Sequence, residues 1–157
     1  MRQVTTILLL LVIAVLTACD SQRVFEQNND IESGNWKKEE IQKFEFEITD
    51  ADRLYNIFYN IRYTVAYPFH NIYLTYSLND ESGAVIASDL QNMDVFDQKT
   101  GKPIGSGLGD LFDLQILSLK NHQFKKPGKY SFSVQQFMRR DSLPEIFSVG
   151  IRVEYSE

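Results

Sequence analysis

The chain has 157 residues, of which 43% are hydrophobic, and a formal net charge of −5 at pH 7. An acidic chain is a poor ligand for nucleic acid or anionic lipid, because both are bound by clustered lysine and arginine. One cysteine and two histidines are too few for a disulfide, a zinc–thiolate site or an iron–sulfur cluster. We therefore expect no metal, no cofactor and no nucleic-acid partner.

The N-terminal segment has the three-part layout of a secretory signal. A basic start at Arg2 precedes an apolar run over residues 6–16, and small residues lead to the single cysteine, Cys19. The run is too short for a transmembrane helix, which needs about 20 apolar residues. Its end, LTAC, resembles a bacterial lipobox, which implies that residues 1–18 are removed and that Cys19 is acylated. A plain secretory signal and a buried N-terminal helix are the alternatives.

Acylation at Cys19 predicts a membrane-bound protein. Each buried methylene of an acyl chain contributes about 0.8 kcal/mol, so that two or three chains form a stable anchor. The polar residues that follow show no hydrophobic period, and we expect residues 19–40 to form the lipidated N-terminus and a tether. Trp36 is expected to pack as the first core residue, with an exposed recognition tryptophan as the alternative. Residues 41–157 are long enough for one domain.

Beyond the tether, apolar and polar residues alternate with a period of two, which is typical of half-buried strands. Residues 97–103 contain glycine and proline and indicate a hairpin turn. Seven or eight short strands without a long helical period predict an all-β fold, an antiparallel β-sandwich. The strands are expected over residues 43–48, 55–65, 71–78, 84–96, 113–119, 129–137 and 147–155.

Gly105, Gly107 and Gly109 alternate in a glycine-rich stretch. Asp110 and Asp113 follow it, whereas a phosphate-binding loop carries a lysine and a serine or threonine after its last glycine. We therefore expect a tight or flexible loop that could contact a partner. No spacing selects a catalytic pair of carboxylates or a serine nucleophile, so that we expect no enzyme.

Five further residues are candidate partner contacts, together with the three glycines. Arg62 lies within an apolar strand, where it either pairs with a carboxylate or recognises a partner. Tyr67 and Asn71 bound a short linker between two strands. Arg139 and Arg140 follow a strand end, where connecting segments commonly carry recognition residues.

Several short motifs follow one another along the chain. They are the lipobox, NW at 35–36, FxFxI at 44–48, YPFHN at 67–71, GSGLGD at 105–110, GKYSFSVQQFMRRD at 128–141 and SVGIRVE at 148–154. In this order, they resemble the GldH gliding-motility lipoproteins of the Bacteroidota. The resemblance implies a non-enzymatic accessory or scaffold component of the gliding and type IX secretion machinery, with other envelope proteins as partners.

Two further expectations concern location and an alternative function. Only one acidic residue directly follows Cys19, which favours an anchor facing the periplasm, in the inner membrane or in the inner leaflet of the outer membrane. The alternative function is a carbohydrate-binding module, because 13% of the residues are aromatic and such rings can stack on sugars.

Overall fold

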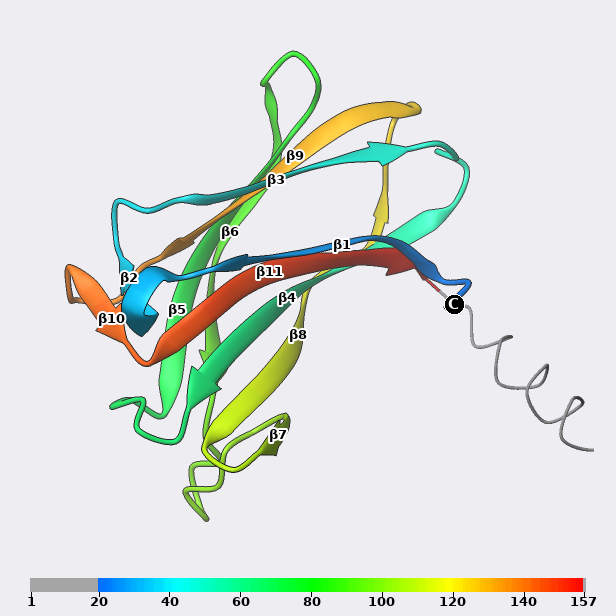
Figure 1. Cartoon of the computed structure of the whole chain (residues 1–157). Helices are drawn as coiled ribbons and strands as arrows, with labels where there is room; N and C mark the ends of the chain where they lie inside the picture. The colour runs from blue at the N-terminus through cyan, green and yellow to red at the C-terminus, as the bar shows by residue number, and fades with distance from the viewer. Residues whose placement is uncertain (1–19, 157) are drawn as a thin grey trace, which may run out of the picture.

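The computed structural model describes residues 20–156, so that the signal peptide and Cys19 lie outside the described residues. It is a β-sandwich of two antiparallel sheets, as the sequence predicts (Figure 1). The first sheet has the order β1 (Arg23–Asp30), β11 (Ile146–Tyr155), β4 (Leu54–Thr64), β8 (Leu111–Gln123) and β7 (Ser106–Leu108).

The second sheet has four strands and packs face to face on the first. Its order is β3 (Gln42–Ile48), β9 (Gly128–Gln136), β5 (Asn71–Asn79) and β6 (Val85–Asp94). A two-stranded ribbon of β2 (Asn35–Lys37) and β10 (Ser142–Pro144) lies at one end, after the 3-10 turn η1 (Glu32–Gly34). All seven strands predicted from the sequence are present, with ends that differ by a few residues.

The period-two pattern is confirmed in β3, β4, β5 and β9, where buried residues occupy every second position. In β3, Phe44, Phe46 and Ile48 are buried while the charged residues between them are exposed. Aromatic side chains fill much of the core: the rings of Tyr76 and Phe132 stack with centroids 5.0 Å apart. Such pairs add about 0.5–1.5 kcal/mol to the free energy gained by burying their area. The core between the two sheets therefore combines aromatic contacts with the packing of isoleucine, leucine and valine side chains.

The segment expected as a tether is largely part of the fold. β1 pairs antiparallel with β11 along its length. Its glutamate, glutamine and asparagine side chains are uncommon in strands, so that the sequence pattern did not predict a strand here. The backbone ladder holds it as an edge strand, with the rings of Phe25 and Phe46 5.7 Å apart and the amide of Asn29 donating to Gln42 at 3.1 Å.

Trp36 is fully buried, as expected for a core residue. It lies in β2 opposite Leu143 of β10, and its indole Nε1 donates to the backbone oxygen of Glu40 at 2.8 Å. This single side chain ties the ribbon to the core. The interpretation of Trp36 as an exposed recognition residue is therefore wrong.

The sandwich has two ends, which we name by their relation to Asp20. At the proximal end β1 begins and β11 finishes, since Arg23 pairs with Glu154, and β4 begins beside the finish of β8 (Figure 1). At the distal end lie η1, the ribbon, and the connections over residues 65–70, 95–105 and 137–141. The two ends therefore expose different sets of loops.

We predict that Phe132→Ala destabilises the domain by about 3–5 kcal/mol, because it leaves a cavity between the sheets. Leu90→Ala is the matched control, since Leu90 is 47% exposed and should change the free energy of unfolding by less than about 0.5 kcal/mol. Equilibrium denaturation in urea measures both. Equal effects of the two substitutions would contradict this description of the core.

Candidate functional site

A polar groove of about 330 Å³ lies on the outer face of the five-stranded sheet. Residues from β1, β4, β7, β8 and β11 line it, so that it crosses the whole sheet. Because alternate residues of a strand point to opposite faces, these polar side chains stand opposite the buried ones. The groove is defined by Glu26, Asp30, Asn60, Arg62, Asp113 and Ser148.

A hydrogen-bonded network continues from one wall of this groove. Arg152 contacts three carboxylates: Asp20 at 2.5 Å, Glu154 at 2.7 Å and Glu26 at 3.4 Å. Burial opposes the charge of Arg152, but hydrogen bonds to Asp20 and Glu154 outweigh it and raise the pKa of the guanidinium. Glu26 also accepts a bond from the amide of Asn60 at 2.9 Å. The network therefore links the first described residue to the middle of the sheet.

Arg62 pairs with a carboxylate, one of the two interpretations that the sequence left open. Its Nε and Nη2 donate to the two oxygens of Asp113 at 2.7 and 3.2 Å, and this bond raises the pKa of Arg62. Both side chains are about half exposed. An exposed pair contributes at most about 1 kcal/mol. Arg62 can therefore leave Asp113 for a carboxylate of another protein with little loss of free energy of folding.

Two of the three candidate glycines have a packing role. A Cβ at Gly105 would lie 2.3 Å from the backbone oxygen of Asp113, and one at Gly107 would lie 2.3 Å from that of Leu111. These positions let β7 approach β8 closely. Gly109 lies in the turn between these strands at φ +66°, with no atom near its missing Cβ. The glycine-rich stretch is thus a tight hairpin.

The structure brings three other candidates together at the distal end, around the ring of Phe69. The guanidinium of Arg140 lies over this ring at 5.9 Å, and the ring of Tyr67 packs on it edge-on at 5.6 Å. The hydroxyl of Tyr67, a buried residue, donates to the backbone oxygen of Asn71 at 3.2 Å. We call Tyr67, Phe69, Asn71, Arg139 and Arg140 the distal cluster.

Arg139 and Arg140 also line a depression of about 430 Å³ beside the ribbon. Both arginines are exposed. Arg62 lies on the outer face of the five-stranded sheet, and the glycines lie in and beside its edge strand β7. The candidate residues thus form two separate surfaces. One is the polar groove with its hairpin, and the other is the distal cluster.

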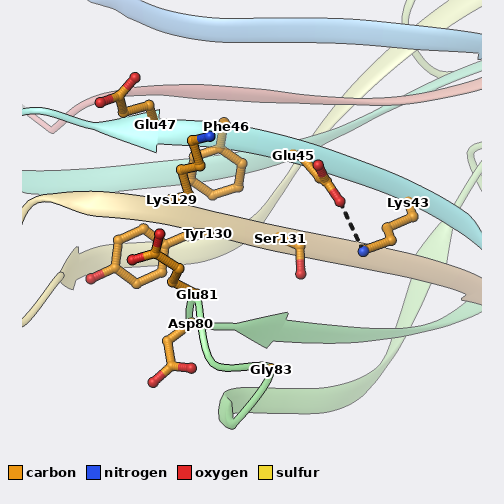
Figure 2. Close-up of a pocket in the computed structure, with 10 residues that line it drawn as sticks. All are labelled: Lys43, Glu45, Phe46, Glu47, Asp80, Glu81, Gly83, Lys129, Tyr130 and Ser131. Atoms are coloured by element: carbon orange, nitrogen blue, oxygen red, sulfur yellow. Dashed lines mark hydrogen bonds and ion pairs between the residues drawn. The ribbon is translucent and has the colours of Figure 1, made fainter.

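A third depression, of about 420 Å³, lies on the outer face of the second sheet (Figure 2). Figure 2 shows that its side chains come from β3, β9 and the hairpin between β5 and β6. Lys43 and Glu45 form an ion pair at 2.9 Å, which lowers the pKa of Glu45, and Asp80 bonds Ser82 within its own turn. Three charged groups of this depression, Lys43, Glu45 and Asp80, are therefore held by contacts with residues near them in the sequence.

Other titratable residues serve the local structure. The carboxylate of Asp97 accepts bonds from Thr100, which lower its pKa and close the hairpin expected over residues 97–103. Burial lowers the pKa of His122, whose ring packs on Phe124 at 4.7 Å. Within residues 20–156, no group of three or more acidic, histidine or cysteine side chains could hold a metal ion.

The tyrosines bear on the carbohydrate-binding alternative. Tyr55, Tyr59, Tyr63 and Tyr76 are buried, and only Tyr73, 38% exposed, presents its ring on a sheet face. Sugar stacking needs exposed aromatic faces. Four of the five tyrosines on β4 and β5 therefore belong to the core.

The family to which the chain is similar covers nearly the whole described fold. The sequence profile of the family described as GldH lipoprotein matches residues 23–153. The match runs from the first residue of β1 almost to the end of β11. The chain belongs to the GldH lipoprotein family. The resemblance seen in the sequence is confirmed, and membership in a lipoprotein family implies attachment to a membrane.

Two GldH relatives are similar over nearly their whole length. The chain is 31% identical over 152 residues to the "Gliding motility lipoprotein GldH homolog" of Christiangramia forsetii, covering 92% of this chain and 91% of that protein. It is 28% identical over 157 residues to the "Gliding motility lipoprotein GldH" of Flavobacterium johnsoniae, covering 96% of both. Within residues 20–156, no helix is long and apolar enough to span a bilayer.

Among solved structures, the chain is similar to part of the GH115 4-O-methyl-alpha-glucuronidase BtGH115A. The TM-score is 0.46 at 12% identity. The match covers 88% of this chain but 18% of the glucuronidase. A similarity of this degree supports no conclusion about the function of the GldH chain.

Sequence reasoning missed the network around Arg152. The signal that could have found it is the polar face of β4, where Asn56, Asn60 and Arg62 recur at every second or fourth position. Their partners come from β1 and β8, far away in the sequence. Only the strand order, which the pattern does not reveal, brings them together.

We predict that Gly107→Ala disrupts the β7 hairpin, because the added Cβ meets a backbone oxygen and the ring of Phe112. Gly109→Ala is the control: it meets no atom and costs only the left-handed backbone strain, about 1–2 kcal/mol. Hydrogen exchange over residues 106–113 measures the difference. Faster exchange is expected for Gly107→Ala, and identical exchange in the two variants would contradict the packing role.

Proposed function

We propose that this GldH chain is a lipid-anchored, non-enzymatic component of the envelope machinery for gliding motility, and that it acts by binding other envelope proteins. The observation that carries the proposal is the family match over residues 23–153, with relatives named for gliding motility. The surface chemistry supports it, because two of the depressions carry exposed ion pairs, Lys43 with Glu45 and Arg62 with Asp113, whose partners can be exchanged. Surfaces of this kind suit recognition.

The anchor is the first element of the proposal. Residues 1–18 act as the signal, and Cys19 receives the acyl chains. The anchor faces the periplasm, from the inner membrane or the inner leaflet of the outer membrane. The folded domain begins near Arg23, where both β1 and the family match start.

The second element is the role of a scaffold that also serves type IX secretion. The distal cluster is the better candidate for the partner contact. Arg140 and Phe69 combine a cation with an aromatic face, and arginine and aromatic residues are enriched in protein interfaces. The exposed pair of Arg62 and Asp113 supplies a second contact surface on the sheet face.

We predict that Cys19→Ala releases the folded protein from the membrane, because the acyl chains supply the attachment. In a gliding host that lacks its own copy of the gene, this variant should appear in the soluble fraction and fail to restore spreading colonies. Immunoblots of washed membranes and colony spreading measure the two effects. Normal gliding in the deletion strain would contradict the proposed function.

We predict that replacing Arg139 and Arg140 together by glutamate weakens gliding while the protein stays folded and on the membrane. The contact of Arg140 with Phe69 is exposed and contributes at most about 1 kcal/mol to stability. Lys99→Glu with Lys102→Glu is the control, since it makes the same charge change on a neighbouring exposed turn. Crosslinking to envelope partners and colony spreading should fall only in the arginine variant. Equal behaviour of both variants would remove the distal cluster as the contact.

A further inference from the structure

We propose that the proximal end of the domain rests on the lipid headgroups in one fixed orientation, with no flexible tether between the anchor and the sandwich. The proposal rests on acylation at Cys19 and goes beyond it. It names a second interaction surface, the proximal end, and commits to one occupant, the bilayer surface. The residues that carry it lie between Asp20 and Arg23 and on β11.

The chain is held to the domain from its first described residue. Asp20 pairs with Arg152 at 2.5 Å, and Arg152 is itself only 14% exposed and bonded to Glu154 at 2.7 Å. Two residues later, the backbone oxygen of Gln22 accepts a bond from the nitrogen of Tyr155 at 2.9 Å. The ladder of β1 with β11 begins at Arg23, which pairs with Glu154, and after an irregularity at Val24 it runs from Phe25 to Asp30.

The length of chain outside the fold decides the geometry. Cys19 directly precedes Asp20, and consecutive Cα atoms lie about 3.8 Å apart. A flexible tether over residues 19–40 would instead span about 25 Å on average. Because Asp20 is paired with Arg152, an anchor at Cys19 in the bilayer holds the proximal end directly against the headgroups, with no layer of water between them. The domain must therefore sit on the membrane.

The same contacts define which loops face the lipid. The backbone nitrogen of Ser156 donates to the oxygen of Leu54 at 2.8 Å, and its neighbour Tyr155 bonds Gln22. The turn over residues 49–53 therefore lies at the same end as the first described residues. The side chain of Asn56 accepts from the nitrogen of Asn121 at 3.0 Å, which adds the end of β8. The guanidinium of Arg53 lies over the ring of Tyr155 at 3.5 Å. Exposed cations and acids are mixed here, so the acyl anchor, and not charge, supplies the attachment.

The orientation also sets the height of the distal cluster. β4 runs from the proximal to the distal end with 11 residues. At about 3.3 Å per residue, it holds the distal cluster about 35 Å from the lipid surface. The domain thus presents this cluster at a fixed height, where a tethered domain would present it over a range of heights and directions.

The test uses the acylated full-length protein in vesicles of phosphatidylethanolamine and phosphatidylglycerol. Cys19 is the single cysteine and is blocked by acylation, so one new cysteine can carry a nitroxide label. Asp52→Cys labels the proximal end and Lys102→Cys the distal end, and both positions are exposed. A nickel-chelating lipid at the headgroup level shortens the relaxation time of nearby labels. We expect the effect to be several-fold stronger at position 52 than at 102.

Two variants test the cause of the orientation. A flexible insert of glycine and serine between Cys19 and Asp20 should abolish the difference between the two labels. Asp20→Asn removes the charge that pairs with Arg152 and should reduce the difference, while Lys43→Gln, which removes an exposed pair with Glu45 on the second sheet, should leave it unchanged. An undiminished difference in Asp20→Asn would overturn the role of that ion pair.

The outcomes separate this proposal from the anchor on which it rests. Equal relaxation at both positions, in protein that sediments with the vesicles, would overturn the fixed orientation and leave the anchor standing. Protein that does not sediment would overturn the anchor itself. Stronger relaxation at position 102 would show that the opposite end faces the lipid, which also overturns the proposal.

Discussion

The pairing of the first strand with the last is the constraint on which the rest of the structure depends. β1 covers the edge of β11, and β11 lies beside β4, the strand whose tyrosines and isoleucines form the centre of the core. Because β1 is an edge strand of polar residues, its own burial contributes little, and its backbone ladder holds it. That ladder brings the N-terminus of the domain back to its C-terminus. Both ends of the described part of the chain, residues 20 and 156, therefore lie at one end of the sandwich.

The outer faces of the two sheets follow from this arrangement. With each sheet covering one face of the other, the remaining faces contact water, and they carry charged and amide side chains. Most of their ion pairs are exposed, and such pairs contribute between nothing and about 1 kcal/mol. Arg152 is the exception, since it is largely buried and contacts three carboxylates. The outer faces can therefore change without loss of the fold, whereas loss of all three carboxylates around Arg152 would leave a largely buried charge without a partner.

The sequence predicted the fold well wherever hydrophobic alternation carried the information. The strands around Phe44 and Ile61 alternate clearly, and both are where the pattern placed them. β1 was missed because its asparagines and glutamate are stabilised by neighbours distant in the sequence, and β7 because it has three residues. Arg62 was recognised as a residue that needs a partner, but the pattern could not name Asp113, which lies 51 positions away. Contacts between distant strands depend on the strand order, which the alternation of apolar and polar residues does not predict.

The proposed anchor at Cys19 would give the paired ends a functional meaning. A lipoprotein with a long tether searches for its partners in many orientations, and each productive contact must pay the entropy of fixing the domain. A domain clamped at Asp20 has already lost that freedom when it folds, because the pairing of β1 with β11 and the contact with Arg152 are part of the folded state. Partners in the same membrane then meet the distal cluster at a constant height. For a protein that acts by contact, this arrangement would raise the effective concentration of the distal cluster at its partner without any additional binding energy.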